Sequence, residues 1–202
     1  MFEKPTSRRL LFFCIHCLLL TSYCYTILMS FLTPEQLVRD LYLRPGDRAC
    51  DIGCGTGAYT IALAREVGDI GQVYAVDVHR DILHTLASTL AKQNLLNVDV
   101  VWADIEKSIP IDKYSLDAVV VSNVLFQLED IDSALRTIHE ILKPEGQMLI
   151  VEWSKSHGGI GPHTDHVVEE SRAEELAKKH NFRILKRLPA GDYHYAFVAL
   201  SV

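Results

Sequence analysis

The residues with the clearest chemical potential in this sequence form a glycine-rich turn. The segment DIGCGTG at residues 51–57 follows a short apolar run at 48–52 and precedes a segment of helical periodicity at 58–67. Glycines in such a turn let the backbone pass close to a bound ligand. The pattern therefore predicts a ligand-binding turn between a buried strand and a helix.

Two kinds of cofactor fit this turn. The spacing of Gly53, Gly55 and Ala58 matches the fingerprint of dinucleotide-binding proteins, in which an acid about 20 residues further on, here Asp77, holds a ribose. Asp51 stands two residues before the first glycine, and its carboxylate would repel a pyrophosphate but attract an ammonium group. S-adenosylmethionine has an ammonium group and no phosphate, so Asp51 favours this cofactor. A dinucleotide, or a tight turn without a ligand, remains an alternative.

The segments around this turn alternate between apolar runs typical of buried strands and patterns typical of helices. The predicted strands occupy residues 48–52, 72–78, 98–102, 116–122 and 147–153. The predicted helices occupy residues 34–43, 58–67, 80–93 and 131–141. Strands separated by helices predict a doubly wound parallel sheet.

The last part of the chain breaks this alternation. A helical pattern at 168–180 is followed by two apolar runs, 182–188 and 195–200, which a turn at 189–192 joins. Two strands connected by so short a loop are antiparallel. We therefore expect a parallel sheet that ends in an antiparallel hairpin.

Length, charge and cysteine content narrow the class of protein. A chain of 202 residues is long enough for one domain with a sizeable core. Its net charge of −6 offers no basic excess for a long nucleic acid, which favours a small-molecule ligand. Only Cys50 and Cys54 lie outside the N-terminal hydrophobic run, so the sequence implies no disulfide framework and fits a reducing compartment.

The N-terminal segment, residues 1–30, stands apart from the predicted domain at 31–202. Residues 10–32 carry no charge and follow three basic residues, Lys4, Arg8 and Arg9, as in a membrane anchor or a signal sequence. A third interpretation is a misassigned start, because the sequence from Met29 opens directly into a helix with Pro34 at its first position. We favour the third and predict a cytoplasmic protein. Membrane association is then possible only through residues 10–32, and a membrane-anchored protein is the alternative.

Five motifs in order along the chain resemble those of class I S-adenosylmethionine-dependent methyltransferases, in particular the small UbiE-like group related to quinone-biosynthesis C-methyltransferases. They are DIGCGTG at 51–57, VYAVDV at 73–78, VVWADIEKSIP at 100–110, SNVLFQLED at 122–130 and LKPEGQMLIVEW at 142–153. The resemblance covers residues 31–202. It implies an α/β fold with a Rossmann-like, doubly wound, seven-stranded sheet and a terminal antiparallel hairpin, and S-adenosylmethionine as cofactor.

The resemblance assigns roles to residues in the first two motifs. Asp51 and the turn with Gly53, Gly55 and Gly57 would face the methionine part of the cofactor. Asp77 resembles the acid that binds both ribose hydroxyls, and the alternative for it is a solvated carboxylate at a strand end. Tyr59 and Thr60, which begin the next helix, are interpreted as packing residues.

Further roles follow for Val78, at the end of the second motif, and for the later motifs. Val78 would pack on the adenine, and Asp104 with Ile105 would bind the adenine amino group. Ser122 and Asn123 would line the methionine side, nearest the transferred methyl group. For Asp104 the alternative is a helix or turn cap, and Asn123 is also a common helix cap.

The acceptor is less visible in the sequence than the cofactor. Ligands of open α/β sheets bind beyond the carboxyl ends of the strands, so residues 126–130 and 152–166 are candidates for its site. The second segment contains His163, Asp165 and His166, but their spacing matches no strong metal-ligand pattern, and we predict no metal. His194 follows the hairpin turn and is assigned to hairpin packing, with acceptor contact as the alternative.

The leading functional hypothesis is methyl transfer from S-adenosylmethionine to a small-molecule acceptor. The alternatives are an NAD-dependent oxidoreductase and a non-catalytic S-adenosylmethionine-binding protein. Methyl transfer requires alignment more than acid–base groups, so no catalytic residue is predicted.

Overall fold

The structure is a computed structural model that describes residues 33–156 and 161–202. The predictions for residues 1–30, including the start at Met29, and for a span at 10–32 lie outside the described residues. In the described part of the chain, no helix is both long and apolar enough to cross a membrane.

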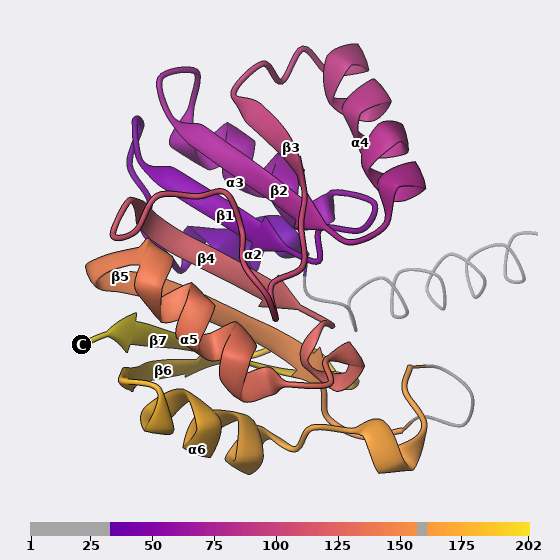
Figure 1. Ribbon diagram of the computed structural model, residues 1–202, viewed down its shortest axis with the longest axis vertical. Coiled ribbons are helices and arrows are strands. Elements are labelled where there is room, and N and C mark those ends of the chain that lie inside the picture. The colour runs from indigo at the N-terminus through magenta and orange to yellow at the C-terminus, as the bar shows by residue number, and fades with distance from the viewer. Residues whose placement is uncertain (1–32, 157–160) are drawn as a thin grey trace, which may run out of the picture.

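A seven-stranded sheet forms the centre of the molecule, in the order β3-β2-β1-β4-β5-β7-β6 (Figure 1). The strands are β1 (Arg48–Ile52), β2 (Gln72–Asp77), β3 (Val98–Trp102), β4 (Leu116–Ser122), β5 (Leu142–Trp153), β6 (Phe182–Leu188) and β7 (His194–Ser201). The first five are parallel, whereas β7 is antiparallel to both of its neighbours, β5 and β6. The predicted Rossmann-like sheet with an antiparallel terminal hairpin is confirmed.

Helices cover both faces of this sheet because alternate strand residues are apolar on each side. The helices are α2 (Pro34–Arg39), α3 (Ala58–Val67), α4 (Arg80–Lys92), α5 (Ile131–Ile141) and α6 (Glu170–Lys179), with short 3₁₀ helices η1 (Leu125–Gln127) and η2 (Thr164–His166). One face packs α2 and α3 on Val120 and Leu149, and α4 continues this layer over β2 and β3. On the other face α5 and α6 pack on Met148 and Ile150, in front of the sheet in Figure 1.

Two elements differ from the sequence prediction by more than two residues at one end. The helix predicted over 34–43 ends at Arg39, because the amides of the next three residues bond to carbonyls only three positions back and Tyr42 has a φ of 49°. β5 begins at Leu142 and not at 147, since Leu142 pairs with Leu116 before an irregularity in the β4–β5 register. Neither change moves the carboxyl ends of the strands.

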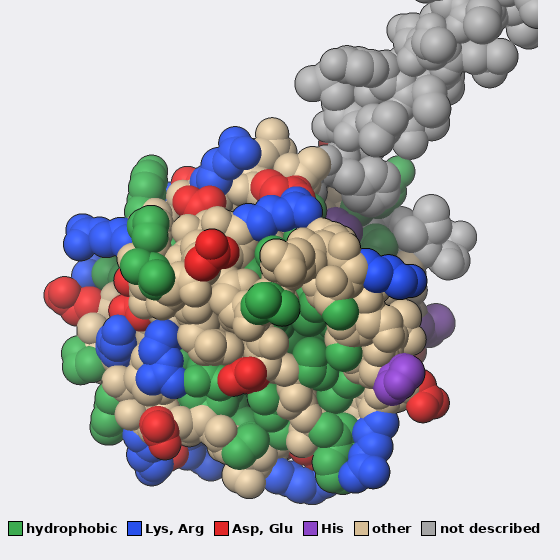
Figure 2. Space-filling model, turned by 90° about the horizontal axis from the view of Figure 1, so that it is seen from above, with side chains coloured by type: hydrophobic (Ala, Val, Ile, Leu, Met, Phe, Trp, Pro, Cys, Tyr) green, Lys and Arg blue, Asp and Glu red, His purple; other side chains and the backbone are tan. Residues whose placement is uncertain are grey.

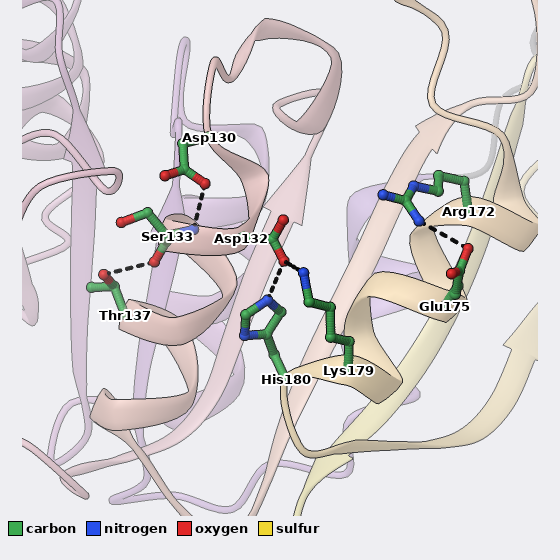
Figure 3. Close-up of polar contacts among 8 residues, drawn as sticks. All are labelled: Asp130, Asp132, Ser133, Thr137, Arg172, Glu175, Lys179 and His180. Atoms are coloured by element: carbon green, nitrogen blue, oxygen red, sulfur yellow. Dashed lines mark hydrogen bonds and ion pairs between the residues drawn. The ribbon is translucent and has the colours of Figure 1, made fainter.

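A polar cluster joins α5 to α6 (Figure 3). Asp130 caps α5 by accepting a hydrogen bond from the Ser133 amide at 2.9 Å. Asp132, in the first turn, pairs with Lys179 and His180 at the end of α6. These two partners, Lys179 first, hold the pKa of Asp132 well below its usual range, at about 2. The cluster therefore anchors the start of α5, which directly follows residues that line the cavity described below.

Charged side chains of both signs are interspersed over the face seen in Figure 2. Lys and Arg do not gather there into a single basic surface. This face therefore lacks the electrostatic footprint typical of nucleic-acid binding.

Asn97 connects the end of α3 to the start of β3. Its Nδ2 donates to the carbonyls of Ala64, at 2.8 Å, and Gly68, at 2.9 Å, and only 9% of the residue is exposed. The last carbonyls of a helix have no partner within the helix. Asn97 therefore satisfies acceptors at the end of the helix that begins at the glycine turn.

We predict that Asn97→Ala lowers the free energy of unfolding by about 1–3 kcal/mol, because it leaves buried carbonyls unpaired. Asn97→Asp keeps the size but lacks the donor, so it should also destabilise the protein. The measurement is urea unfolding, with Leu96→Ala as control, since Leu96 is 83% exposed. Equal stability of Asn97→Ala and this control would contradict the assigned role.

Candidate functional site

A cavity of about 340 Å³ lies at the carboxyl edge of the sheet, beyond β1, β2, β3 and β4. This volume is in the range of small-molecule sites. Six predicted site residues line it, namely Gly53, Gly55, Asp77, Val78, Asp104 and Ile105. Larger grooves, of about 500 and 550 Å³, flank α6, and none of the predicted cofactor-binding residues lines them. The first contains Leu128, Glu129 and Asp130 of the segment 126–130 that was predicted for the acceptor. The structure thus brings residues from three separate motifs together around one cavity.

The glycine turn approaches its neighbours too closely for side chains. Gly53 and Gly57 have φ angles of 65° and 88°, which favour glycine. A Cβ atom on Gly53 would stand 2.4 Å from Val124 Cγ2, and one on Gly57 would stand 2.2 Å from Leu86 Cδ1. These contacts explain why glycine is needed at both positions, and they place Val124 in the wall of the cavity.

Asp77, at the end of β2, is held by the glycine turn and by the start of α4. Its Oδ2 accepts a hydrogen bond from the Gly55 amide at 3.1 Å. Its Oδ1 lies 2.9 Å from the His79 amide and 2.9 Å from His79 Nδ1. A carboxylate offers about four acceptor positions, and these three contacts occupy all but one of them. A ligand with two hydroxyl groups would use the remaining position and would replace the His79 ring at a second. This ring is 66% exposed and has room to turn away.

Asp104, after β3, both caps a turn and lines the cavity. Its Oδ1 accepts from the Glu106 amide at 3.0 Å, and its Oδ2 pairs with Lys107 Nζ at 2.8 Å. The hydrogen bond from Lys107 is the main reason that the pKa of Asp104 is lowered. Nearby, Val78 is half exposed and Ile105 is buried, so the two present apolar surface on the cavity wall.

Asp51 lies behind the turn and not on the cavity wall. It is 2% exposed, and Thr60 Oγ1 donates a hydrogen bond to its Oδ2 at 2.6 Å. Burial raises the pKa of Asp51 to about 7; the hydrogen bonds with Thr60 oppose this rise, and the charge of Asp77 adds to it. Sequence reasoning interpreted Thr60 as a packing residue and missed this bond. The predicted contact of Asp51 with an ammonium group stays a prediction.

Ser122 and Asn123, at the end of β4, line a separate cavity of about 140 Å³. Asn123 has a φ of 57°, and its amide donates to the Val151 carbonyl at 2.8 Å. In the described part of the chain, its buried Oδ1 has no hydrogen-bond partner. The next residue, Val124, lines the larger cavity. Residues 123 and 124 therefore stand between the two cavities.

Sequence reasoning missed His79 and Val124 in the larger cavity. Gln127 and Leu128, which also line it, belong to the segment 126–130 that was predicted for the acceptor. Gln127 Nε2 donates to the Asn123 carbonyl at 2.6 Å, which closes the loop after β4. The SNVLFQLED motif could have pointed to the residues of the loop after β4. Periodicity, however, does not show in which direction a side chain in a loop points.

Glu152, near the end of β5, is fully buried. Its Oε1 accepts from the Trp153 amide at 2.9 Å, and burial raises its pKa to about 7. The amides of residues 124–126 oppose this rise, so the carboxyl group faces the segment that lines the larger cavity. Sequence reasoning gave this residue no role of its own.

His163 and His166, the described histidines between β5 and α6, form no metal centre with the described residues around them. His163 Nδ1 lies 3.3 Å from Asp165 Oδ2, and both side chains are largely exposed. Across residues 33–156 and 161–202, no group of three or more His, Cys, Asp or Glu side chains is placed to hold a metal ion.

Comparison with solved structures supports the same fold. A structure of a SAM dependent methyltransferase from Aquifex aeolicus matches with a TM-score of 0.79 and 25% identity, covering 86% of this chain and 92% of that one. The [4+2]-cyclase SpnF, at 20% identity, has a TM-score of 0.71 over 83% of this chain and 80% of its own.

Curated relatives are methyltransferases by name. The ubiquinone/menaquinone biosynthesis C-methyltransferase UbiE of Teredinibacter turnerae is 35% identical over 58% of this chain and 47% of its own length. The demethylmenaquinone methyltransferase of Lactobacillus johnsonii is 32% identical over 60% of this chain and 50% of its own. The chain therefore spans about half the length of these relatives.

The profile of a family described as methyltransferase domain matches residues 43–190. This match includes the glycine turn, Asp77 at the end of β2 and the loop after β4. The resemblance to class I S-adenosylmethionine-dependent methyltransferases of the UbiE-like group, expected from the motifs, is thereby confirmed. Because the match covers well over half of its length, the chain belongs to the methyltransferase domain family.

Proposed function

We propose that this chain is an S-adenosylmethionine-dependent methyltransferase that methylates a small-molecule acceptor. The observation that carries the proposal is the cavity of about 340 Å³ in which the glycine turn, Asp77 and Asp104 meet. Family membership supports the cofactor and the reaction class. The names of the curated relatives support a small-molecule acceptor.

The residues around the cavity fit this cofactor. Asp77 is held at the end of β2 with a remaining acceptor position for a ribose hydroxyl. Val78 and Ile105 offer apolar surface for adenine, and Asp104 lies on the same wall for the adenine amino group. Gly55 has a φ of 50°, and a Cβ on it would meet no atom closer than 3.9 Å, so a ligand has room to approach the backbone there.

When bound, S-adenosylmethionine would supply a methyl group on a sulfonium sulfur: the acceptor atom attacks the methyl carbon in line as the bond from sulfur to carbon breaks, and S-adenosylhomocysteine leaves. The chain's part is to orient the two reactants and to exclude water. Apolar side chains, including Ile52, Val76 and Val124, line the cavity and favour this exclusion. Whether a base is needed depends on the acceptor. A cytosolic location is proposed on the same ground, because this cofactor is expected in the cytosol.

Calorimetry of the full chain with S-adenosylmethionine, S-adenosylhomocysteine and NAD tests the proposal. We expect the first two to bind and NAD not to bind. Incubation with S-adenosylmethionine labelled on its methyl group and a small-molecule cell extract should then transfer the label to a product. Binding of NAD alone would support the oxidoreductase alternative, and cofactor binding without transfer would support the non-catalytic one.

We predict that Asp77→Ala weakens S-adenosylmethionine binding by about 2–3 kcal/mol, because charge-assisted hydrogen bonds to the ribose are lost. This loss corresponds to a rise in Kd of about 30- to 150-fold. Calorimetry measures it, and Asp81→Ala is the control, since exposed Asp81 lies in the first turn of α4 and lines neither cavity. An unchanged Kd in folded Asp77→Ala would refute the ribose assignment.

The raised pKa of Asp51 predicts that the stability of the protein depends on pH. A carboxyl group whose pKa is raised in the folded state gives full stability below its unfolded pKa, and that stability is lost as pH rises through the folded value. For Asp51 the interval runs from 3.8 to about 7. We expect Asp51→Asn to raise the free energy of unfolding of the ligand-free protein at pH 8 by about 1–3 kcal/mol, because a buried charge is removed.

Urea unfolding at pH 5 and pH 8 measures this effect. The difference between the two pH values should be smaller in Asp51→Asn than in the wild type, with Glu152 contributing the remaining slope in the same direction. Binding of S-adenosylmethionine should weaken in the same variant if Asp51 faces its ammonium group. A pH dependence identical to that of the wild type would show that Asp51 is charged at no cost in the folded protein.

A further inference from the structure

His79 lines the larger cavity but has no part in the function proposed above. It follows Asp77 by two positions and directly precedes α4. Its ring Nδ1 lies 2.9 Å from Asp77 Oδ1, and its side chain is 66% exposed. A carboxylate oxygen only accepts hydrogen bonds, so Nδ1 carries the hydrogen in this contact. The ring therefore donates to the same carboxylate to which the ribose of a cofactor would bind.

The ring of His79 is not needed for the local structure. His79 is the N-cap residue of α4, yet its side chain makes no capping hydrogen bond. The start of α4 is connected to Asp77 by the backbone amide of His79, at 2.9 Å from Oδ1. The carbonyl of His79 accepts from the Leu83 amide at 3.2 Å. Both bonds belong to the backbone, so a change of this side chain should leave the helix start in place.

The carboxylate of Asp77 cannot serve the ring and both ribose hydroxyls at once. Its Oδ2 accepts from the Gly55 amide at 3.1 Å, and its Oδ1 accepts from the His79 amide. These two backbone bonds leave about two of its acceptor positions. Two ribose hydroxyls need both of them, whereas the ring occupies one. The ring and a ribose with two hydroxyls are therefore mutually exclusive, and a ligand without these hydroxyls has no need to displace the ring.

The His79 ring is also the group on this wall that can become positively charged. Among the described residues that line the larger cavity, there is no Lys or Arg. Histidine ordinarily changes its charge between pH 5 and 8, and a charged donor bonds a carboxylate more strongly than a neutral one. Acid should therefore strengthen the contact between the ring and Asp77.

Other charged groups lie on the elements that adjoin the ring. They are the acids Asp51, Asp77, Asp81, Asp104 and Glu106 and the bases Arg80 and Lys107. The Arg80 guanidinium lies over the ring of Trp102, 3.8 Å from its centroid, and Lys107 pairs with Asp104 at 2.8 Å. Both bases thus have partners of their own, and His79 is the base that contacts Asp77.

We propose that the His79 ring is a displaceable partner of Asp77, which competes with the ribose hydroxyls and competes most strongly when it is protonated. The inference rests on the proposed function, because it takes the larger cavity as the cofactor site. A ligand's apparent affinity is reduced by the fraction of protein in which its position is taken. S-adenosylmethionine and S-adenosylhomocysteine carry the same ribose, so the ring weakens the binding of both and favours the departure of the product.

The test uses the full chain and two probes, adenosine and 2′,3′-dideoxyadenosine, with binding followed by ligand-observed NMR. Adenosine carries both ribose hydroxyls and the second probe carries neither. Both lack the ammonium group that Asp51 is predicted to face. His79→Ala should tighten adenosine binding at pH 8 about 2- to 10-fold, as expected when one competing hydrogen bond is removed. Binding of dideoxyadenosine should stay within twofold of the wild type.

A second variant separates the hydrogen bond of the ring from its size. His79→Phe keeps an aromatic ring but has no N–H group, so it should also tighten adenosine binding. S-adenosylhomocysteine, measured by calorimetry, should bind more tightly to both variants by a similar factor. His84→Ala is the matched control and should change none of these affinities, because exposed His84 lies in α4 and lines neither cavity.

Comparison of pH 8 with pH 5.5 tests the role of protonation. Adenosine binding by the wild type should weaken at least threefold at pH 5.5, and by less than half that factor in His79→Ala and His79→Phe. The other titratable groups are common to all three proteins, so the difference between them comes from the ring. An identical pH dependence in the three proteins would refute competition by the protonated ring.

The proposal is overturned if neither variant tightens the binding of adenosine or S-adenosylhomocysteine. It is also overturned if dideoxyadenosine gains as much affinity as adenosine, or if His79→Ala tightens adenosine binding and His79→Phe does not, because the size of the ring then accounts for the effect. A wild-type chain that binds neither S-adenosylhomocysteine nor adenosine refutes the proposed function first, and this inference with it. A chain that binds S-adenosylhomocysteine equally well with and without the His79 ring refutes the competition alone.

Discussion

The carboxyl edge of this sheet depends on the close approach of the glycine turn to its neighbours. At Gly53 and Gly57 only a hydrogen atom fits between the backbone and the side chains of Val124 and Leu86. This approach brings the loop after β4 and the helix α4 against the end of β1. The same turn bonds to Asp77 through the Gly55 amide. One backbone conformation therefore both encloses the cavity and orients the acid on its wall.

Much of the fold could be predicted because its signals are local. The strands at 48–52, 98–102 and 116–122 and the helices at 58–67 and 131–141 have the predicted bounds, since apolar runs and helical periodicity end at clear breaks in the sequence. The short turn before β7 correctly predicted an antiparallel pair. The position of β7 between β5 and β6 could not be predicted from residue patterns, because pairing between strands that are distant in sequence sets this order.

Site residues could be predicted where they lie at or just after the end of a strand. They were harder to predict where the packing of the surrounding elements decides whether a side chain lines the cavity. Asp77 ends β2 and Asp104 follows β3, and both line the cavity. Asp51 lies in β1, but its side chain points to Thr60 under the turn. Tyr59, one position before Thr60, lines the small cavity at the end of β4. Helical periodicity gave no sign of this cavity. Cavities arise where packing is incomplete, which depends on all the surrounding elements together.

The position of β7 has a consequence for synthesis on the ribosome. β7 follows the other six strands in sequence, yet it lies between β5 and β6 and pairs with both. Until its residues leave the exit tunnel, β5 has an unpaired edge, and β6 has no partner in the sheet. Such an edge is a template for association with other chains. The nascent domain therefore passes through a stage in which the edge of β5 is open to such association, and this stage ends when β7 pairs with β5.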